Sequence, residues 1–301
     1  MSSSDHYLLG IDIGTSGLKC VLIDHAGQMR GLAFRAYAPI TPQPGWAEQD
    51  RDRSSIAGLG FSGQMHSTVC LDQDRRCLRP AILWLDRRSV PQVTALREKL
   101  GTSQLACWIG NPIAPGFMLA SVLWLKESEP ATWERLAHVL LPKDYVRWRL
   151  TGELGTDYSD ASSTALLDVQ HRTWCSELAD AAAIPLDILP PLFESAAPIG
   201  GLMPQMARAM NLPAGLPVVC GAGDQEAQAI GNGLIRPGIV SCTIGTGGQL
   251  FTPIEHYRID SQLRLHTFCH AVPKHWHWEA ATLAAGLSLR WLRDEVLAGR
   301  Y

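Results

Sequence analysis

A carboxylate stands beside a glycine-containing turn near the start of the chain. Asp12 ends an apolar, β-branched run and precedes Gly14, Thr15, Ser16 and Gly17. The dinucleotide fingerprint G-x-G-x-x-G would have glycine in place of Asp12, and a P-loop would end in Gly-Lys-Ser/Thr, so both common nucleotide sites are disfavoured. Since anions repel each other, a carboxylate beside a phosphate-binding turn requires a divalent cation between them. The pattern favours Mg²⁺ with a nucleotide; the alternative is an ordinary hairpin.

A second glycine turn, Gly245-Thr246-Gly247-Gly248, follows a strand-like run late in the chain. Its backbone N–H groups are unobstructed by side chains and could bind a phosphate. The stretch 13–17 matches the stretch 244–248 in sequence and in strand–turn–strand context, as expected of a duplicated unit that supplies both sides of a cleft. We expect the two turns to hold one polyphosphate from opposite sides.

Asp224 follows Gly221-Ala222-Gly223 and precedes a helix-like stretch, so its carboxylate is expected at a strand-to-helix junction. Asp is common as a helix N-cap, and that is the structural alternative. Phosphoryl transfer to an alcohol also requires a base that accepts the hydroxyl proton. An aspartate between two phosphate-binding turns fits this role.

Gln64, Met65 and His66 follow a short apolar run, where α/β proteins usually carry ligand-binding groups. Gln64 and His66 offer directional hydrogen bonds and Met65 an adaptable apolar wall, as recognition of a polyol requires. A lone histidine after a strand is more often structural, so these residues alone assign no sugar.

Composition narrows the classes of partner. With 26 basic and 29 acidic residues the formal charge is −3, too balanced for a nucleic-acid tract or a membrane-surface patch. The eight cysteines are scattered without metal or disulfide spacing, and no segment has the length of a membrane span, so we expect a cytoplasmic protein. Histidines and a cysteine near the end lack the spacing of familiar metal sites, and exposed strand and loop positions are the favoured explanation for His266, Cys269, His270, His275 and His277.

The elements that must position these residues follow from the apolar periodicity. Residues 7–13, 18–24 and 29–37 predict an antiparallel meander, and strands are expected at 56–61, 216–220 and 239–244. Helical patterns cover 91–100, 118–127, 132–137, 144–150 and 280–297. A meander that returns to a parallel strand normally crosses through a helix, yet Pro42, Pro44 and Gly45 leave no amphipathic stretch. The Pro-rich stretch 185–204 is the best candidate for a lobe boundary.

These motifs, taken in order, resemble the FGGY carbohydrate kinases and, within them, the xylulokinases. The resemblance runs from about Leu8 to the last expected helix. It is carried by GIDIGTSGLK (10–19), PGWAEQD (44–50), GFSGQMH (60–66), RPAILWLDRR (79–88), LLPKDYVRWRLTGE (140–153), GAGDQEAQAIG (221–231), SCTIGTGG (241–248) and HTFCHAVPKHWH (266–277).

The resemblance implies an α/β protein with the actin-like, ribonuclease H-like two-lobed ATPase fold, in which sugar and ATP meet in the cleft. Residues 1–214 would form the N-terminal lobe and 215–301 the beginning of an incomplete C-terminal lobe. Asp12 would be the Mg²⁺-associated carboxylate and Asp224 the general base, which also contacts the sugar. ATP contacts would come from Gly14, Thr15, Ser16, Lys19, Gly245, Thr246, Gly247 and Gly248. The segment Gln64-Met65-His66 would bind the acceptor, with D-xylulose favoured.

Three departures from the family pattern bear on activity. Ala120 and Ser121 stand where xylulokinases typically carry Pro-Lys. The crossover helix expected between Asp50 and Ile56 is missing, which would leave an apolar sheet face uncovered. Family members also continue well beyond the last expected helix. The alternatives to a pentulose kinase are a catalytically impaired sugar-binding remnant, or a kinase for another sugar or polyol. A homodimer is the commonest assembly.

Overall fold

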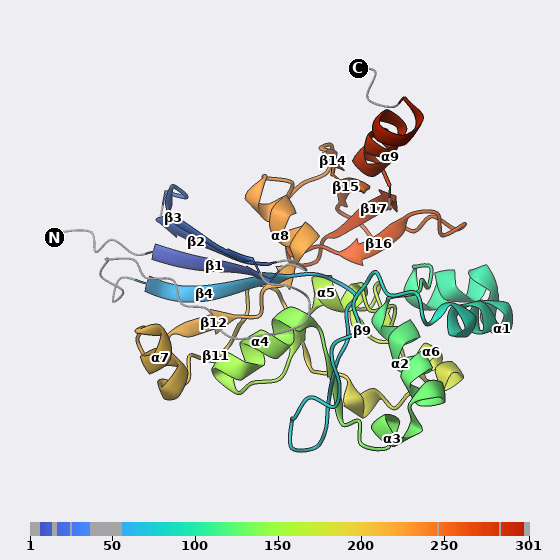
Figure 1. Cartoon of the computed structure of the whole chain (residues 1–301), viewed down its shortest axis with the longest axis horizontal. Coiled ribbons are helices and arrows are strands. Elements are labelled where there is room, and N and C mark those ends of the chain that lie inside the picture. The colour runs from blue at the N-terminus through green and yellow to red at the C-terminus, as the bar shows by residue number, and fades with distance from the viewer. Residues whose placement is uncertain are drawn as a thin grey trace.

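A seven-stranded mixed sheet forms the centre of the molecule (Figure 1). The computed structural model describes residues 7–13, 17–24, 26–36, 56–245, 247–282 and 284–297. The strand order is β11-β12-β4-β1-β2-β3, and β13 also pairs with β4. The strands are β1 (Tyr7–Ile13), β2 (Gly17–Asp24), β3 (Met29–Ala36), β4 (Ile56–Gly63), β11 (Pro198–Gly201), β12 (Pro217–Val219) and β13 (Ala222–Gly223).

The expected meander of the first three strands is confirmed. Strand β2 pairs antiparallel with β1 and with β3. Asp24 closes the β2–β3 turn, because its Oδ1 accepts hydrogen bonds from the N–H groups of Ala26 and Gln28, and its Oδ2 pairs with Arg30 at 2.6 Å. Strand β4 then runs parallel to β1, so the carboxyl ends of both strands meet at one edge of the sheet.

The two faces of this sheet are covered unequally. Ile11, Leu59 and Phe61 are buried on one face against α4 (Pro142–Thr151) and α7 (Pro204–Met210), which lie beneath the sheet in Figure 1. On the other face Leu8, Leu32 and Phe34 are 51%, 62% and 59% exposed.

The expectation of an uncovered apolar sheet face stays a prediction. The stretch 37–55, where the crossover helix was expected, lies outside the described residues.

A helical unit lies to one side of the sheet. Its core joins α1 (Val90–Ile109), α2 (Met118–Ser128) and α6 (Ser176–Ala182). The helix expected at 91–100 continues to Ile109 through a break at Gly101, whose φ is 73°. The helix expected at 132–137 is wrong in extent: α3 spans Pro130–Trp133, and the chain then turns to pair with β5, where Ala137 N–H donates to Leu71 O at 2.9 Å.

Short elements complete this part of the chain. They are β5 (Val69–Leu71), β6 (His138–Leu140), β7 (Thr156–Asp157), α5 (Tyr158–Ser162), β8 (Leu167–Asp168), β9 (Thr173–Trp174), η2 (Leu186–Ile188) and β10 (Leu192–Phe193). Helix α5 is almost entirely buried, and the site depends on it.

A second, antiparallel sheet follows helix α8 (Asp224–Gly231). Its order is β14-β15-β17-β16, with β14 (Ser241–Ile244), β15 (Gly248–Ile254), β16 (His266–Cys269) and β17 (Trp276–Thr282). The matching sequence stretches both form hairpins, since Ile13 faces Leu18 in one and Ile244 faces Gly248 in the other.

The helix expected at 280–297 is wrong at its start. Ala280–Thr282 belongs to β17, because Ala280 pairs with Leu250 and Thr282 with Gly248. Helical structure begins with α9 (Gly286–Trp291) and continues as a π-helical turn, η3 (Leu292–Val296). Among the described residues, no helix is both long and apolar enough to cross a membrane.

Candidate active site

Asp12 and Asp224 come to the same edge of the first sheet. Strands β1 and β13 both pair in parallel with β4, and Ser62 faces Asp12 on one side and Ala222 on the other. The Ser62 hydroxyl donates to Asp12 Oδ1 at 3.3 Å. Asp224 is the first residue of α8, and Gly223 occupies the N-cap position. The junction expected from the sequence is therefore present, and the cap itself is the glycine.

The environment of Asp224 suits a proton acceptor near neutral pH. Burial, and then the negative charges of Asp12 and Glu279, raise the pKa of Asp224 from 3.8 to about 7. Hydrogen bonds from Gln225 act in the opposite direction. A carboxylate with this pKa is more basic than an ordinary aspartate, yet a large fraction is ionised at pH 7.

The expected sugar segment directly follows β4. His66 has a positive φ of 68°, an uncommon conformation for a non-glycine residue that often marks a functional position. Its N–H donates to Ser163 Oγ at 3.2 Å, and its Nδ1 lies 2.6 Å from Ser163 O. Since a carbonyl only accepts, Nδ1 carries the proton, and Nε2 is the acceptor nitrogen.

Packing fixes the same segment from both sides. The His66 ring stacks on Phe117, with ring centroids 4.1 Å apart, and burial lowers the pKa of His66, so the ring is neutral near pH 7. Met65 is 5% exposed and lies so close to Gly223 that a Cβ on this glycine would be 3.0 Å from Met65 Cγ. Gln64 is also buried. The sugar segment thus touches the backbone next to Asp224.

The phosphate turns are described only in part. Gly14, Thr15, Ser16 and Thr246 lie outside the described residues. Lys19 is exposed and faces Asp12 across the β1–β2 hairpin.

In the second turn, Gly245 N–H donates to Gly247 O at 2.8 Å, so this expected phosphate donor is used within the turn. Gly248 already belongs to β15, opposite Ile244.

The histidines of the second sheet are not the exposed residues that the sequence suggested. His270 and His277 are 1% and 0% exposed, and the His277 ring stacks on Phe251 at 4.1 Å. Ring packing explains the error, because both imidazole rings pack against Phe251 as aromatic side chains do. Within the described part of the chain, no cluster of three or more His, Cys, Asp or Glu residues could hold a metal ion.

Two buried glutamates flank His277. Its Nε2 lies 3.5 Å from Glu226 Oε1 and 3.6 Å from Glu279 Oε2. Burial and the neighbouring Glu279 raise the pKa of Glu226 well above its ordinary value. Burial opposes ionisation of Glu279 too, yet hydrogen bonding and charge from His277 lower its pKa overall. Glu279 is therefore an anion, and its charge acts on Asp224.

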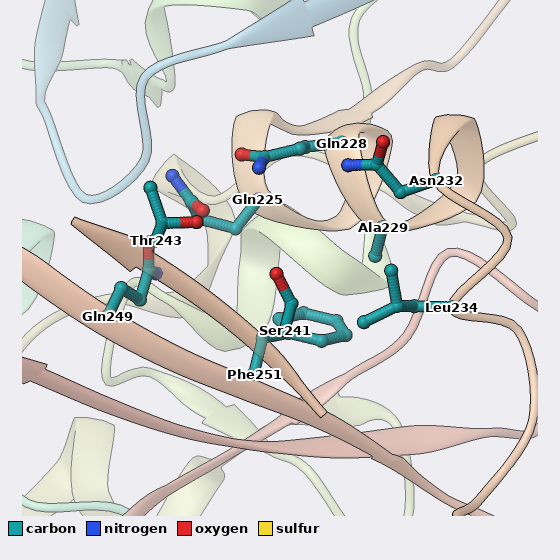
Figure 2. A pocket seen from close by; sticks show the side chains of 9 residues that line it. All are labelled: Gln225, Gln228, Ala229, Asn232, Leu234, Ser241, Thr243, Gln249 and Phe251. Carbon is teal, nitrogen blue, oxygen red and sulfur yellow. The ribbon is translucent and has the colours of Figure 1, made fainter. Parts of the chain in front are cut away.

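A small pocket lies between α8 and the β14–β15 hairpin. Figure 2 shows amide and hydroxyl side chains at its rim, among them Gln225, Gln228 and Thr243. Gln225 is the residue after Asp224, so the pocket begins beside the proposed base.

The family model described as the FGGY family of carbohydrate kinases, N-terminal domain, matches residues 7–54 and 50–231. The chain belongs to the FGGY family of carbohydrate kinases. The two matched segments overlap at residues 50–54, where the crossover helix was expected.

Curated relatives include xylulose kinases. That of Escherichia coli is 35% identical over 94% of this chain and 62% of its own length, and that of Bacillus subtilis 36% over 95% and 61%. A gluconokinase of B. subtilis is 29% identical over 96% of this chain. The chain thus spans about 62% of the length of these relatives.

Solved structures agree on the fold. A xyloylose kinase from Brucella ovis superposes with a TM-score of 0.89 at 36% identity, covering 97% of this chain and 64% of that structure. A xylulose kinase from Rhodospirillum rubrum gives 0.88 at 28% identity. The expected actin-like α/β fold is confirmed, with the second lobe represented in part.

Several residues around the site were missed by sequence reasoning. His66 contacts Phe117 and Ser163, and the charge of Glu279 raises the pKa of Asp224. None of these three residues belongs to a motif that the sequence analysis used. The run Ser159-Asp160-Ala161-Ser162-Ser163 offered a signal, since so many small polar residues in one buried segment require partners.

Proposed function

We propose that the protein is an ATP-dependent carbohydrate kinase that transfers the γ-phosphoryl group to a pentulose, with D-xylulose as the favoured acceptor. The observation that carries this proposal is the placement of Asp224, with its pKa raised to about 7, at the same sheet edge as Asp12. The names of the relatives and the Gln64-Met65-His66 segment support the choice of sugar.

The residues present suit a nucleotide-bound Mg²⁺. Asp12 offers a carboxylate and Ser62 a neighbouring hydroxyl, and Mg²⁺ in phosphoryl-transfer sites is typically held by one or two carboxylates and phosphate oxygens. Mg²⁺ would neutralise charge on the transferred phosphoryl group. Lys19 and the glycine turns are proposed as phosphate contacts.

The remaining chemistry belongs to the chain itself. Asp224 accepts the proton of the sugar hydroxyl as the hydroxyl attacks the γ-phosphorus. His66 Nε2 accepts a hydrogen bond from the sugar, and Met65 supplies an apolar wall. Glu279, an anion, keeps the pKa of Asp224 high.

The domain division at residue 214 stays a prediction. Strands β12 and β13, which follow that residue, pair with β4 within the first sheet. A cytoplasmic location and a homodimer also stay predictions.

A substrate panel tests the proposal. ATP consumption is measured with D-xylulose, L-ribulose, L-fuculose, gluconate and glycerol, and the acceptors are ranked by kcat/KM. The proposal expects D-xylulose to rank first. Sugar binding without turnover would instead establish the catalytically impaired remnant, and a higher rank for gluconate would favour the activity named for the B. subtilis relative.

A further inference from the structure

Helix α5 connects three segments of the site through serine hydroxyls. Ser159 Oγ accepts from Gly223 N–H at 3.2 Å, directly before Asp224. Ser163 Oγ, one residue after the helix, accepts from His66 N–H at 3.2 Å. Ser162 Oγ accepts from Cys269 N–H of β16 at 3.1 Å. Residues in or directly after this short buried helix therefore contact the backbone before Asp224, the Gln64-Met65-His66 segment and the second sheet.

Lys143 forms ion pairs with acidic residues in and near this helix. Its Nζ is 2.8 Å from Asp144 Oδ1, 2.9 Å from Asp157 Oδ1 and 3.3 Å from Asp160 Oδ2, and all four side chains are 0% exposed. A buried lysine is stable as a cation only when carboxylates pair with it. Lys143 therefore depends on these three aspartates.

Two of these aspartates also accept hydrogen bonds from the serines of the site. Asp157 Oδ2 accepts from both the N–H and the hydroxyl of Ser159, and from Ser195 Oγ at 2.6 Å. Asp160 receives the Ser163 hydroxyl on its carbonyl oxygen at 2.7 Å and on Oδ1 at 3.3 Å. The Asp157 carboxylate thus orients the Ser159 hydroxyl, whereas the Ser163 hydroxyl is oriented mainly by the backbone carbonyl of Asp160. Lys143 contacts the side chains of both aspartates.

A second buried cation shares Asp144 with Lys143. Arg147 pairs with Asp144 at 2.6 Å and also donates to Cys220 O at 2.9 Å, in the segment that leads to Asp224. Burial raises the pKa of Asp160 well above its ordinary value.

We propose that Ser159 and Ser163 are positioning residues for phosphoryl transfer, held by Lys143, Asp157 and Asp160. Ser159 fixes the backbone from which Asp224 projects. The Ser163 hydroxyl holds the left-handed backbone of His66, whereas the ring tautomer is set by the Ser163 carbonyl oxygen, which every substitution at this position keeps. This inference rests on the proposed function, because positioning matters for catalysis only if Asp224 and His66 act on a sugar.

The two serines are expected to affect different kinetic constants. Ser159→Ala removes the acceptor of Gly223 N–H and is expected to lower kcat at least about tenfold, with the sugar KM within about threefold. Ser163→Ala is expected to raise the sugar KM at least about tenfold, with kcat within about threefold. If the two serines had only a structural role, the substitutions would lower Tm, and neither would change one of the two kinetic constants selectively.

Thr156→Val is the matched control. Thr156 is 0% exposed, precedes Asp157, and its Oγ1 has no hydrogen-bond partner among the described residues. Valine has nearly the same shape, so neither kinetic constant should change. Lys143→Met is unsuitable as the primary test, because an uncompensated buried charge is expected to prevent folding.

Amide hydrogen exchange of the sugar-free protein separates this inference from the proposed function. Ser159→Ala should speed exchange in residues 220–226 and leave 64–68 unchanged, and Ser163→Ala should do the reverse. If the wild type phosphorylates no sugar while each variant still loosens its own segment, the proposed function fails and the anchoring stands. If an active wild type gives variants with unchanged exchange, or with kcat and KM altered in parallel, the positioning proposal is overturned.

Discussion

Asp12 and Asp224 lie at the carboxyl ends of two strand segments that both pair in parallel with β4, and the charge of one raises the pKa of the other. Parallel strands end at the same edge, so the sheet itself brings these residues together although more than two hundred positions separate them. Their proximity would place the proposed cation-binding carboxylate next to the proposed proton acceptor.

Asp12→Asn should lower the pKa of Asp224. The change removes the repulsion from Asp12, which is the second largest cause of the raised pKa. Burial is the largest cause and remains, so the pKa should move toward 3.8 without reaching it. Carboxyl-carbon NMR titration of the sugar-free protein measures the shift. An unchanged titration would show that the two carboxylates do not sense each other.

Asp224→Asn should stabilise the protein increasingly as pH rises. Because the pKa of Asp224 is raised in the folded state, its contribution to stability is fully present below pH 3.8 and is lost as pH rises through about 7. Asparagine does not ionise, so the Tm difference between variant and wild type should grow between about pH 4 and about pH 7 and stay level at higher pH. Calorimetric scans measure this trend; a pH-independent difference would contradict it.

His66→Asn should weaken sugar binding and leave the fold intact. Asparagine tolerates a positive φ, and its amide can still donate toward Ser163 O, but the acceptor Nε2 is lost. The sugar KM is expected to rise at least about tenfold, with the KM for ATP within about threefold. Initial-rate measurements with each substrate varied decide this. A fall in kcat alone would remove His66 from sugar binding.

Gly63→Ala should destabilise the junction of β4 with α4. A Cβ at Gly63 would lie 2.7 Å from Lys143 Cβ, and both backbones would have to shift. The expected cost is about 1–3 kcal/mol in the free energy of unfolding, measured by denaturant titration. Gly60→Ala is the matched control on the same strand, because its Cβ would meet Val219 at an ordinary 3.4 Å. Equal effects of the two changes would contradict the close packing on Lys143.

Local patterns predicted the strands well. The meander, β4 and the Asp224 junction follow from β-branched runs that end in glycine, and no distant contact is needed to specify them. Patterns failed where pairing decides the structure. Ala280–Thr282 reads as the start of an apolar helix, yet it forms the end of β17 because β15 supplies its hydrogen bonds.

The support beneath the site could not be predicted from the sequence. Lys143 and Arg147 carry charges that are usually exposed to solvent, yet both are fully buried in α4. The burial of Lys143 depends on Asp157 and Asp160, which come from a later segment of the chain. Spacing alone does not show which charges pair, because the partners meet only after the sheet and α5 have packed.

The central claim is that Asp224 accepts the proton of the sugar hydroxyl, and Asp224→Asn tests it most directly. We expect kcat with D-xylulose and ATP to fall by roughly 10²–10⁴-fold, while the Kd for the sugar, measured by calorimetry, stays within about threefold. Turnover near the wild-type rate would contradict the account.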